Sequence, residues 1–410
     1  MGIEFYTEET IENIAAPAVQ HFIIDHEHSD VKQLLLKSKT VMGLPATVIA
    51  DQIQGRRKAR EKFPEWYVRQ GIVYPPSLNL EQSSSLATAA YKKEIIQQQL
   101  KGKLKVAADL TGGYGIDTLM ISTLVDTMHY VEPNVNLSLI ARHNHLLSGA
   151  RNIVYHTTTA EEFIQTSDHA FDVVFIDPSR RDAHQKRFIR FADGVPDVTS
   201  LMDVLLKCSR LVMIKSSPLL DIHAAVKELN HVGEVYVVAY HNECKEVIYL
   251  CGKEWHSDAS PMTAINLGDH SQQRFMFNPD DERLCTMNYS PPQHYVYEPN
   301  AAILKAGAFK LIGKSFGLMK LHINTHLYTS QELMENFPGR VFQILSGIKP
   351  KPADVKKVIP ELKANVITRN YPLGAEALKK SLGVADGGDV YIIGCTSTEG
   401  KHVLIASRLQ

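Results

Sequence analysis

One segment concentrates glycine, acidic and threonine residues directly after a hydrophobic run. Residues 109–115 read DLTGGYG, between the run Val106–Leu110 and the helical pattern Ile116–Leu124. Glycine lets the backbone approach a ligand closely, and the first turn of the following helix presents N–H groups to that ligand. The segment therefore predicts a binding loop. Its candidate ligand-binding residues are Asp109, Thr111, Gly113 and Gly115.

A second polar segment, DPSRR at residues 177–181, follows the strongly hydrophobic run Asp172–Ile176. A carboxylate and the backbone carbonyl after it can accept hydrogens from an amine and so direct its nitrogen lone pair, which is catalysis by positioning. Arginine can stack on a base or hold a phosphate. The candidate catalytic residues are Asp177, Pro178 and Ser179, and the candidate substrate-binding residues are Arg180 and Arg181.

Two further charged residues lie at the ends of hydrophobic runs. Glu132 follows Thr127–Val131, where an acidic side chain can accept hydrogen bonds from both hydroxyls of a ribose. Lys215 ends the run Arg210–Lys215 and precedes a Ser-Ser-Pro turn. It either faces a substrate or pairs with Asp177, and the sequence leaves both roles open.

Three polar residues have two interpretations each. Thr159 lies in TTTAEE at residues 157–162, a pattern that suits a ligand contact and is equally typical of a helix cap followed by glutamate. Gln82 and Ser84 precede the first hydrophobic run and carry side-chain donors for a ligand. A capped surface helix explains these two residues as well.

The hydrophobic runs alternate with helical patterns from residue 105 onward. Strands that alternate with helices and are hydrophobic on both faces predict an α/β fold, with a parallel sheet and helices on both of its sides. Ligands bind beyond the carboxyl ends of such strands, so we expect the polar segments to meet in one cleft. Glu234–His241 and Glu246–Cys251 are expected to close the sheet as a pair of strands.

The regions on either side have a different character. Residues 1–98 predict helices, with hydrophobic residues such as Ile11, Ile14 and Ala15 at helical spacing. The last 155 or so residues predict an α+β domain. Its expected strands are Met319–His326, Arg340–Leu345, Asn365–Arg369, Val390–Cys395 and His402–Ser407, and its expected helices are Gln331–Asn336, Asp354–Leu362 and Ala375–Leu382.

Length and composition limit the class of protein. A chain of 410 residues is too long for one compact core, so we expect two or three domains. Its hydrophobic runs fall short of the roughly 20 residues of a membrane span, and its start lacks the features of a signal peptide, which predicts a cytoplasmic protein. The five cysteines form no C-x-x-C pair, so neither a metal site nor a disulfide framework is expected.

Positive charge is concentrated locally. The whole chain has a net charge of −1, but residues 301–410 carry 15 Lys and Arg against 8 Asp and Glu. A second basic cluster is RRKAR at residues 56–60. Each is consistent either with a solvated face or with contacts to a nucleic-acid backbone.

The spacing of Asp109, Gly113 and Gly115 resembles the D-x-x-x-G-x-G loop of class I S-adenosylmethionine-dependent methyltransferases. In that family the loop wraps the methionine and ribose parts of the cofactor, and a polar residue placed like Thr159 often recognises adenine. A polar segment before the first strand often closes over the cofactor's carboxylate, a role that falls here to residues 82–84. The resemblance implies S-adenosylmethionine as the cofactor.

Residues 177–181 resemble the catalytic motif of amino-methyltransferases, which is Asp or Asn, two prolines and an aromatic residue. Here Ser179 replaces the second proline and Arg180 replaces the aromatic residue. The departure leaves Asp177 and the Pro178 carbonyl to orient the acceptor, and it weakens the case for an adenine or guanine amine as the target.

Nearly the whole chain resembles a bacterial family of class I methyltransferases with C-terminal ferredoxin-like and THUMP-like domains. Residues 81–92, 109–115, 177–181 and 215–218 carry the likeness in the catalytic part, and residues 297–307, 366–372 and 386–389 carry it in the C-terminal part. The resemblance implies an N-terminal helical region (1–98), a Rossmann-like methyltransferase domain (99–253), a ferredoxin-like domain (254–346) and a THUMP-like domain (347–410).

THUMP domains are associated with RNA, especially tRNA and structured ends. The resemblance therefore implies methylation of a structured rRNA or tRNA at a base nitrogen. Two alternatives stay open: a methyltransferase that acts on a protein or a small molecule, with the C-terminal part serving dimerisation, and an RNA-binding protein that keeps the cofactor fold and has lost catalysis.

Overall fold

The computed structural model describes residues 5–180, 190–255, 260–269 and 271–410. The chain divides into two compact units, Met1–Gly233 with Ile248–Asp258 and Glu234–Val247 with Ala259–Gln410. The hydrophobic cores of the helical part and of the C-terminal sheet lie in different units.

The first unit begins with the expected helices. They are α1 (Glu8–Ala15), α2 (Pro17–Asp25), α3 (Val31–Lys37), α4 (Ala46–Lys62), α5 (Pro64–Val68), α6 (Ser77–Gln82) and α7 (Leu86–Gln99), with a short hairpin of β1 (Thr40–Val41) and β2 (Leu44–Pro45) before α4. Ile53, Phe63 and Trp66 belong to the same buried cluster as Ile116 and Ile140, which lie further along the chain. The N-terminal helices therefore share a core with the α/β part.

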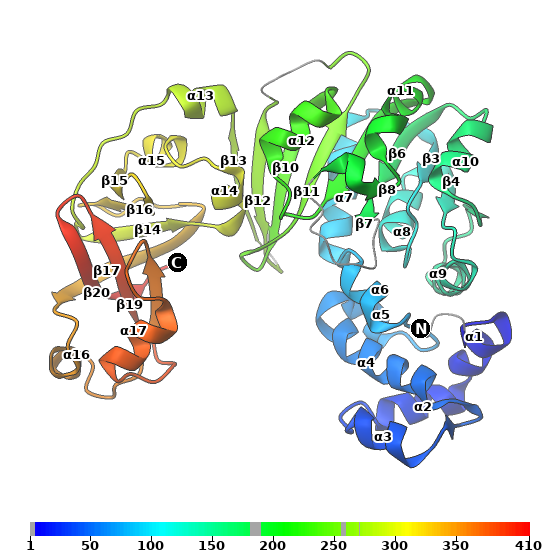
Figure 1. The fold of residues 1–410 in the computed structure, drawn as a ribbon, viewed down its shortest axis with the longest axis horizontal. Coiled ribbons are helices and arrows are strands. Elements are labelled where there is room, and N and C mark those ends of the chain that lie inside the picture. Colours follow the sequence, from blue (N-terminus) through cyan, green and yellow to red (C-terminus); the bar gives the residue numbers. More distant parts are fainter. Residues whose placement is uncertain (1–4, 181–189, 256–259, 270) are drawn as a thin grey trace. The chain divides into compact units, whose positions relative to one another are not determined.

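The α/β part of this unit has the expected parallel sheet (Figure 1). Its strands are β3 (Leu104–Asp109), β4 (Val125–Val131), β5 (Ile153–His156), β6 (Phe171–Ile176) and β9 (Ser209–Ser216), in the order β9-β6-β3-β4-β5. Adjacent strands pair in parallel throughout this set. The alternating helices are α8 (Ile116–Ser122), α9 (Val135–Leu147), α10 (Ala160–Thr166), α11 (Val198–Cys208) and α12 (Ile222–Leu229). Parallel order places the carboxyl ends of these strands at one edge.

A buried ion pair joins the last N-terminal helix to the first helix of the sheet. The Lys92 side chain of α7 is fully buried, and its Nζ lies 3.0 Å from Asp117 Oδ1 of α8. Ser84 Oγ donates to Asp117 Oδ2 at 2.6 Å, and Lys92 Nζ donates to Ser84 Oγ at 3.1 Å. The charge of Asp117 is thus balanced within a part of the core where an unpaired carboxylate would be costly.

The second unit contains two sets of strands. β10 (Val232–Tyr240), most of which belongs to this unit, pairs in parallel with β12 (Met262–Leu267), and β12 pairs antiparallel with β13 (Gln272–Phe277). The other set is a seven-stranded sheet of order β15-β16-β14-β17-β20-β19-β18. Its strands are β14 (Tyr295–Pro299), β15 (Met319–His322), β16 (Thr325–Ser330), β17 (Gly339–Ile348), β18 (Asn365–Arg369), β19 (Val390–Ser397) and β20 (Gly400–Arg408). Its neighbouring strands are antiparallel except β18 and β19, which α17 connects.

The helices that accompany these strands are α13 (Pro279–Leu284), α14 (Ala301–Ala306), α15 (Leu311–Ser315), α16 (Pro352–Val358) and α17 (Ala375–Leu382). Hydrophobic residues of α16 and α17, including Val355 and Leu378, form one core with Ile392 and Ile405 of the sheet. The C-terminal region is therefore the α+β domain that the sequence predicts.

Two local expectations are wrong in this domain. Met319–His326 is not one strand, because β15 and β16 are separated by a turn at residues 323–324. Gln331–Asn336 is not a helix. The Tyr297 hydroxyl accepts a hydrogen bond from Met334 N at 2.8 Å and donates to Glu332 O at 3.2 Å, so it captures backbone groups that a helix would pair internally.

Within the described part of the chain, no helix combines the length and the hydrophobicity needed to span a membrane.

Replacement of Lys92 with Met should lower the free energy of unfolding of the first unit by about 3–5 kcal/mol, because it leaves the buried Asp117 carboxylate unpaired. Both tryptophans, Trp66 and Trp255, belong to this unit, so urea unfolding followed by their fluorescence measures it selectively. The double variant Lys92→Met/Asp117→Leu should recover most of the loss. A single variant as stable as the parent would contradict the assigned role of the pair.

Candidate active site

The glycine loop bridges the strands on either side of β3. Leu110 N donates to Phe175 O of β6 at 3.0 Å, and Gly112 N donates to Val131 O of β4 at 2.9 Å. The backbone that leaves β3 therefore binds to the ends of both neighbouring strands. Gly113 and Gly115 have positive φ angles of 54° and 83°, which cost a residue with a Cβ about 1–2 kcal/mol.

Glu132 connects this loop to the end of β4. Its Oε2 accepts a hydrogen bond from Gly113 N at 3.0 Å, and its Oε1 accepts one from Asn134 N at 2.9 Å. Burial raises the pKa of the Glu132 carboxyl, while these two backbone hydrogen bonds act to lower it. A carboxylate has about four acceptor positions, so Glu132 can still accept hydrogen bonds from a ligand's hydroxyls.

Asp109 lies beneath the loop and is only 1% exposed. Its Oδ1 accepts a hydrogen bond from Thr111 N at 3.0 Å, and its Oδ2 accepts one from Thr118 Oγ1 at 2.6 Å. Burial raises the pKa of Asp109 from 3.8 to about 7, against the lowering effect of the Thr118 hydrogen bond. Asp109 therefore holds the start of the loop and the first helix after it from beneath.

Asp177 is held from both sides at the end of β6. Its backbone N donates to Thr111 Oγ1 at 2.7 Å, which joins it to the glycine loop. Its Oδ2 forms an ion pair with Lys215 Nζ of β9. The Lys215 side chain is 10% exposed and that of Asp177 is 31% exposed. Of the two roles open for Lys215, the structure shows the pairing with Asp177, and the carboxylate is the more accessible partner.

The other candidates around the acceptor segment differ in their surroundings. Pro178 is buried, and Ser179 is exposed in β7 (Ser179–Arg180), which pairs with β8 (Gly194–Val195). Ser179 Oγ contacts Val195 O at 3.4 Å, which is long for a hydroxyl donor. The backbone of Arg180 belongs to β7, and Arg181 lies outside the described residues.

The two upstream candidates also differ. Ser84 is 6% exposed, and its hydroxyl is engaged with Asp117 and Lys92. Gln82 is exposed at the last position of α6. Ser84 therefore helps to join α7 to α8, while the Gln82 side chain is accessible.

Thr159 is the N-cap of α10. Its side chain accepts a hydrogen bond from Glu162 N at 3.2 Å. This is the capping geometry that the sequence pattern allowed. The hydroxyl retains its own hydrogen for a further partner.

Sequence reasoning missed two residues that shape the loop. The Tyr130 hydroxyl donates to Gly113 O at 2.6 Å. A Cβ on Gly112 would lie 2.3 Å from Tyr130 Cε2, so only glycine fits there. The place of Tyr130 in a hydrophobic strand could not reveal that its ring packs against Gly112, which precedes it by 18 residues.

The basic cluster at residues 56–60 is engaged within the helical region. Arg56 Nε and Arg60 Nη2 each lie 2.9 Å from the Glu27 carboxylate, which is almost fully buried. Arg57 donates to the backbone O atoms of Glu27 and Ser29, and Lys58 pairs with Glu81. These contacts hold the N-terminal helices together, which favours a structural role over an RNA contact.

Comparisons with known proteins identify the family. The solved structure of a protein assigned as a methyltransferase from Porphyromonas gingivalis W83 matches with a TM-score of 0.84 and 31% identity, over 99% of this chain and 100% of that one. Residues 295–338 match the model of a ferredoxin-like domain, and residues 339–408 match a model described as THUMP domain-like. The chain belongs to this family of methyltransferases. It has the class I methyltransferase fold with C-terminal ferredoxin-like and THUMP-like domains.

Other similarities are much weaker. An rRNA methylase from Streptococcus thermophilus has 12% identity and a TM-score of 0.31, over 40% of this chain and 95% of its own. A SAM-dependent methyltransferase from Agrobacterium tumefaciens has 14% identity and a TM-score of 0.32, over 45% of this chain and 64% of its own. No curated protein matches the chain.

Replacement of Gly112 with Ala should destabilise the first unit by about 1–3 kcal/mol, because the buried Tyr130 ring must move. The matched variant is Gly113→Ala, whose Cβ meets only Thr111 O at an ordinary 3.6 Å. It should cost only the backbone strain, about 1–2 kcal/mol, and leave Tyr130 in place. Thermal unfolding followed by tryptophan fluorescence compares the two. Equal stability of the Gly112 variant and the parent would refute the packing argument.

Proposed function

We propose that this family member is an S-adenosylmethionine-dependent methyltransferase that modifies a structured rRNA or tRNA at a base nitrogen. The observation that carries the proposal is a continuous set of contacts at the carboxyl ends of β4, β3, β6 and β9. It runs from Glu132 through the glycine loop to Asp177 and Lys215. One loop thus contacts the carboxylate of Glu132, which suits a ribose, and the backbone N of Asp177, whose carboxylate suits an amine.

The residues around Gly113 fit the cofactor. A Cβ built on Gly113 meets nothing closer than 3.6 Å, so the backbone leaves room for a ligand. Glu132 would offer acceptors for the ribose hydroxyls, and the loop from Asp109 to Gly115 would hold the methionine part. S-adenosylmethionine supplies, when bound, a methyl group activated by its sulfonium. Gln82 is a proposed contact to the cofactor's carboxylate, and Thr159 is a proposed contact to its adenine. Ser84 supports the segment that carries Gln82 through its hydrogen bond to Asp117.

Asp177 and Pro178 supply the proposed catalysis. The Asp177 oxygen that Lys215 does not hold, together with the Pro178 carbonyl, accepts hydrogens from the acceptor amine and aims its lone pair. Asp177 or water would accept the proton that the amine releases on taking the methyl group. Lys215 keeps the carboxylate in one orientation throughout.

Support for an RNA substrate comes from the C-terminal domain. Residues 339–408 match the THUMP-like model, and the excess of basic over acidic residues lies in the same region. Lys349 and Lys351, which lie between β17 and α16, are exposed, and so is Lys356 of α16. Basic side chains that contact phosphates weaken their binding steeply as salt rises. Arg180 and Arg181 are proposed to contact the same substrate near the reacting base.

Replacement of Asp177 with Ala should lower the rate of methyl transfer to RNA by about a hundredfold or more, because the acceptor amine loses its orienting carboxylate. Transfer of labelled methyl groups to total bacterial RNA at saturating cofactor measures this rate. Binding of S-adenosylmethionine, followed by calorimetry, should change little.

The matched control is Asp168→Ala, which removes an exposed carboxylate before β6 begins. It should methylate RNA like the parent. If the Asp177 variant also methylates RNA as fast as the parent, the proposed catalytic role is wrong. If the parent transfers methyl groups to protein instead, the proposed RNA substrate is wrong.

Binding of S-adenosylmethionine should tighten as pH rises through 7. The pKa of Asp109 is raised from 3.8 to about 7, so below pH 7 its carboxyl is mostly protonated. A cationic ligand binds better to the ionised carboxylate, so its binding must release this proton. By the same linkage, Asp109 makes the fold less stable as pH rises between about 4 and 7. We expect affinity to be about tenfold higher at pH 8 than at pH 6, as measured by calorimetry. The Asp109→Asn variant should lose this dependence, and a parent with flat affinity would contradict it.

A further inference from the structure

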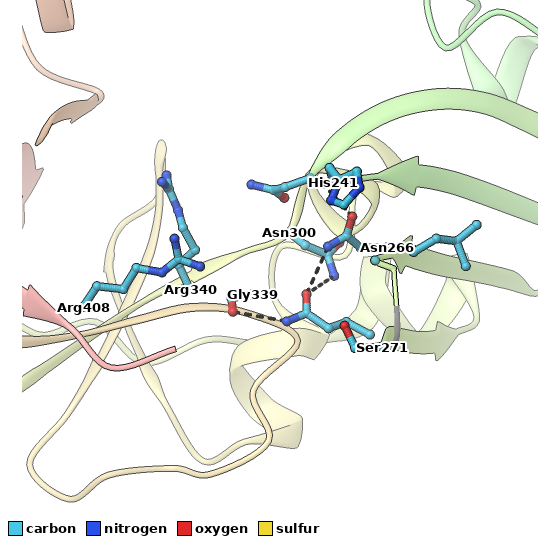
Figure 2. Close-up of a pocket in the computed structure, with 11 residues that line it drawn as sticks. His241, Asn266, Ser271, Asn300, Gly339, Arg340 and Arg408 are labelled. Atoms are coloured by element: carbon cyan, nitrogen blue, oxygen red, sulfur yellow. Dashed lines mark hydrogen bonds between the residues drawn. The ribbon is translucent and has the colours of Figure 1, made fainter. Parts of the chain in front are cut away.

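A polar pocket of about 430 Å³ lies within the second unit, away from the glycine loop in the sequence (Figure 2). It is formed by the turn after β10, the turn between β12 and β13, the start of α14, the start of β17 and the end of β20. A volume of this size suits a small organic ligand. Of the 11 described residues that line it, none is Asp or Glu.

Two arginines form one side of the pocket. The Arg340 Nε donates to Glu298 Oε2 at 2.8 Å, and the same buried carboxylate also pairs with Arg369. Glu298 is 2% exposed, and its contact fixes the Arg340 side chain. Its single negative charge is shared by two guanidinium groups, those of Arg340 and Arg369, so one positive charge remains. Arg408 is exposed, and its Nε donates to Gln410 O at 2.8 Å. Arg340 and Arg408 therefore present positive charge with one guanidinium already oriented.

Side-chain amides form the other side. Figure 2 shows Asn266 and Asn300 across the pocket from Arg340 and Arg408. Asn266 Nδ2 and Asn300 Nδ2 donate to Gln273 Oε1 at 3.4 and 3.3 Å, which is long for hydrogen bonds. A ligand can replace such contacts at little cost. The Oδ1 atoms of both asparagines already accept backbone hydrogen bonds, so these amides chiefly offer their Nδ2 donors, which suit acceptors on the edge of a nucleobase.

We propose that this pocket binds one nucleotide of a single-stranded RNA segment, with its phosphate on Arg340 and Arg408 and its base edge on Asn266, Gln273 and Asn300. Guanidinium groups bind phosphate oxygens in pairs, and amides read the edges of bases that are splayed out of a strand. The arginines alone would suit any anion, and the amides alone would suit many polar ligands. Their placement on opposite sides of one pocket favours a ligand with a phosphate at one end and a base at the other, which is a nucleotide. The inference rests on the proposed function, because it takes RNA to be the substrate.

The test uses the full chain and a fluorescein-labelled, random-sequence, single-stranded RNA of 12 nucleotides. Fluorescence anisotropy gives its affinity at several salt concentrations. The Arg408→Glu variant should bind at least tenfold more weakly, and the slope of log affinity against log salt should become shallower by about 0.7, the value for one phosphate of a single strand. The Asn266→Asp variant keeps the acceptor that Asn242 N uses but lacks the amide donor. It should also bind at least tenfold more weakly.

The matched control is Arg283→Glu. It makes the same charge change on α13, where the Arg283 side chain is 74% exposed and pairs with Asp280 on its own helix. It should bind the RNA within about twofold of the parent. Equal losses for Arg283→Glu and Arg408→Glu would overturn the pocket in favour of a diffuse charge effect. Parent-like binding by Arg408→Glu and Asn266→Asp, with thermal unfolding unchanged, would overturn it directly.

Competition separates RNA from a free nucleotide. Unlabelled 12-nucleotide RNA should displace the probe at least a hundredfold more effectively than a mixture of the four nucleoside monophosphates, because a strand also contacts the protein beyond the pocket. Equal potency would overturn the assignment to RNA. The pocket and the proposed function also fail differently. If the Arg408→Glu variant methylates limiting RNA as fast as the parent, the pocket proposal is wrong. If RNA binding depends on the pocket but no methyl group is transferred, the proposed function is wrong.

Discussion

The site depends on how the backbone leaves the central strand of the parallel sheet. Leu110 and Gly112 donate hydrogen bonds to the ends of β6 and β4 respectively, so the loop spans both neighbours of β3. A Cβ at Gly112 would enter the Tyr130 ring. This path brings Gly113 to Glu132 on one side and Thr111 to Asp177 on the other. The loop therefore binds the Glu132 carboxylate through a peptide N–H and the backbone of Asp177 through the Thr111 hydroxyl.

The surroundings hold this loop from below and behind. Buried Asp109 accepts hydrogen bonds from Thr111 and Thr118 beneath the loop. The ion pair of Lys92 and Asp117 joins the N-terminal helices to α8, which begins directly after the loop. Displacement of this part of the first unit would therefore change the shape of the loop. Side chains that never contact a ligand can in this way affect its binding.

The second unit repeats this division between framework and ligand groups. Buried Glu298 anchors Arg340 and Arg369, and long hydrogen bonds hold the amides around Gln273. The ion pair supplies rigidity, and the weakly bonded amides supply groups that a ligand can recruit. A pocket built this way can be oriented before binding and still adapt to its ligand.

The sequence by itself determined the parallel sheet, the helical N-terminal region and the α+β C-terminal domain, because hydrophobic periodicity and glycine placement act over short distances. It also marked the strand ends that carry Glu132, Asp177 and Lys215. Only the tertiary structure decided what these side chains contact. Lys215 pairs with Asp177, and Ser84 donates to Asp117. Arg56 and Arg60 pair with Glu27. The helix expected at Gln331–Asn336 is absent because Tyr297, distant in the sequence, takes its backbone hydrogen bonds. Side chains that pair across dozens of residues leave no local pattern in the sequence. Their burial and their partners therefore became known only from the tertiary structure.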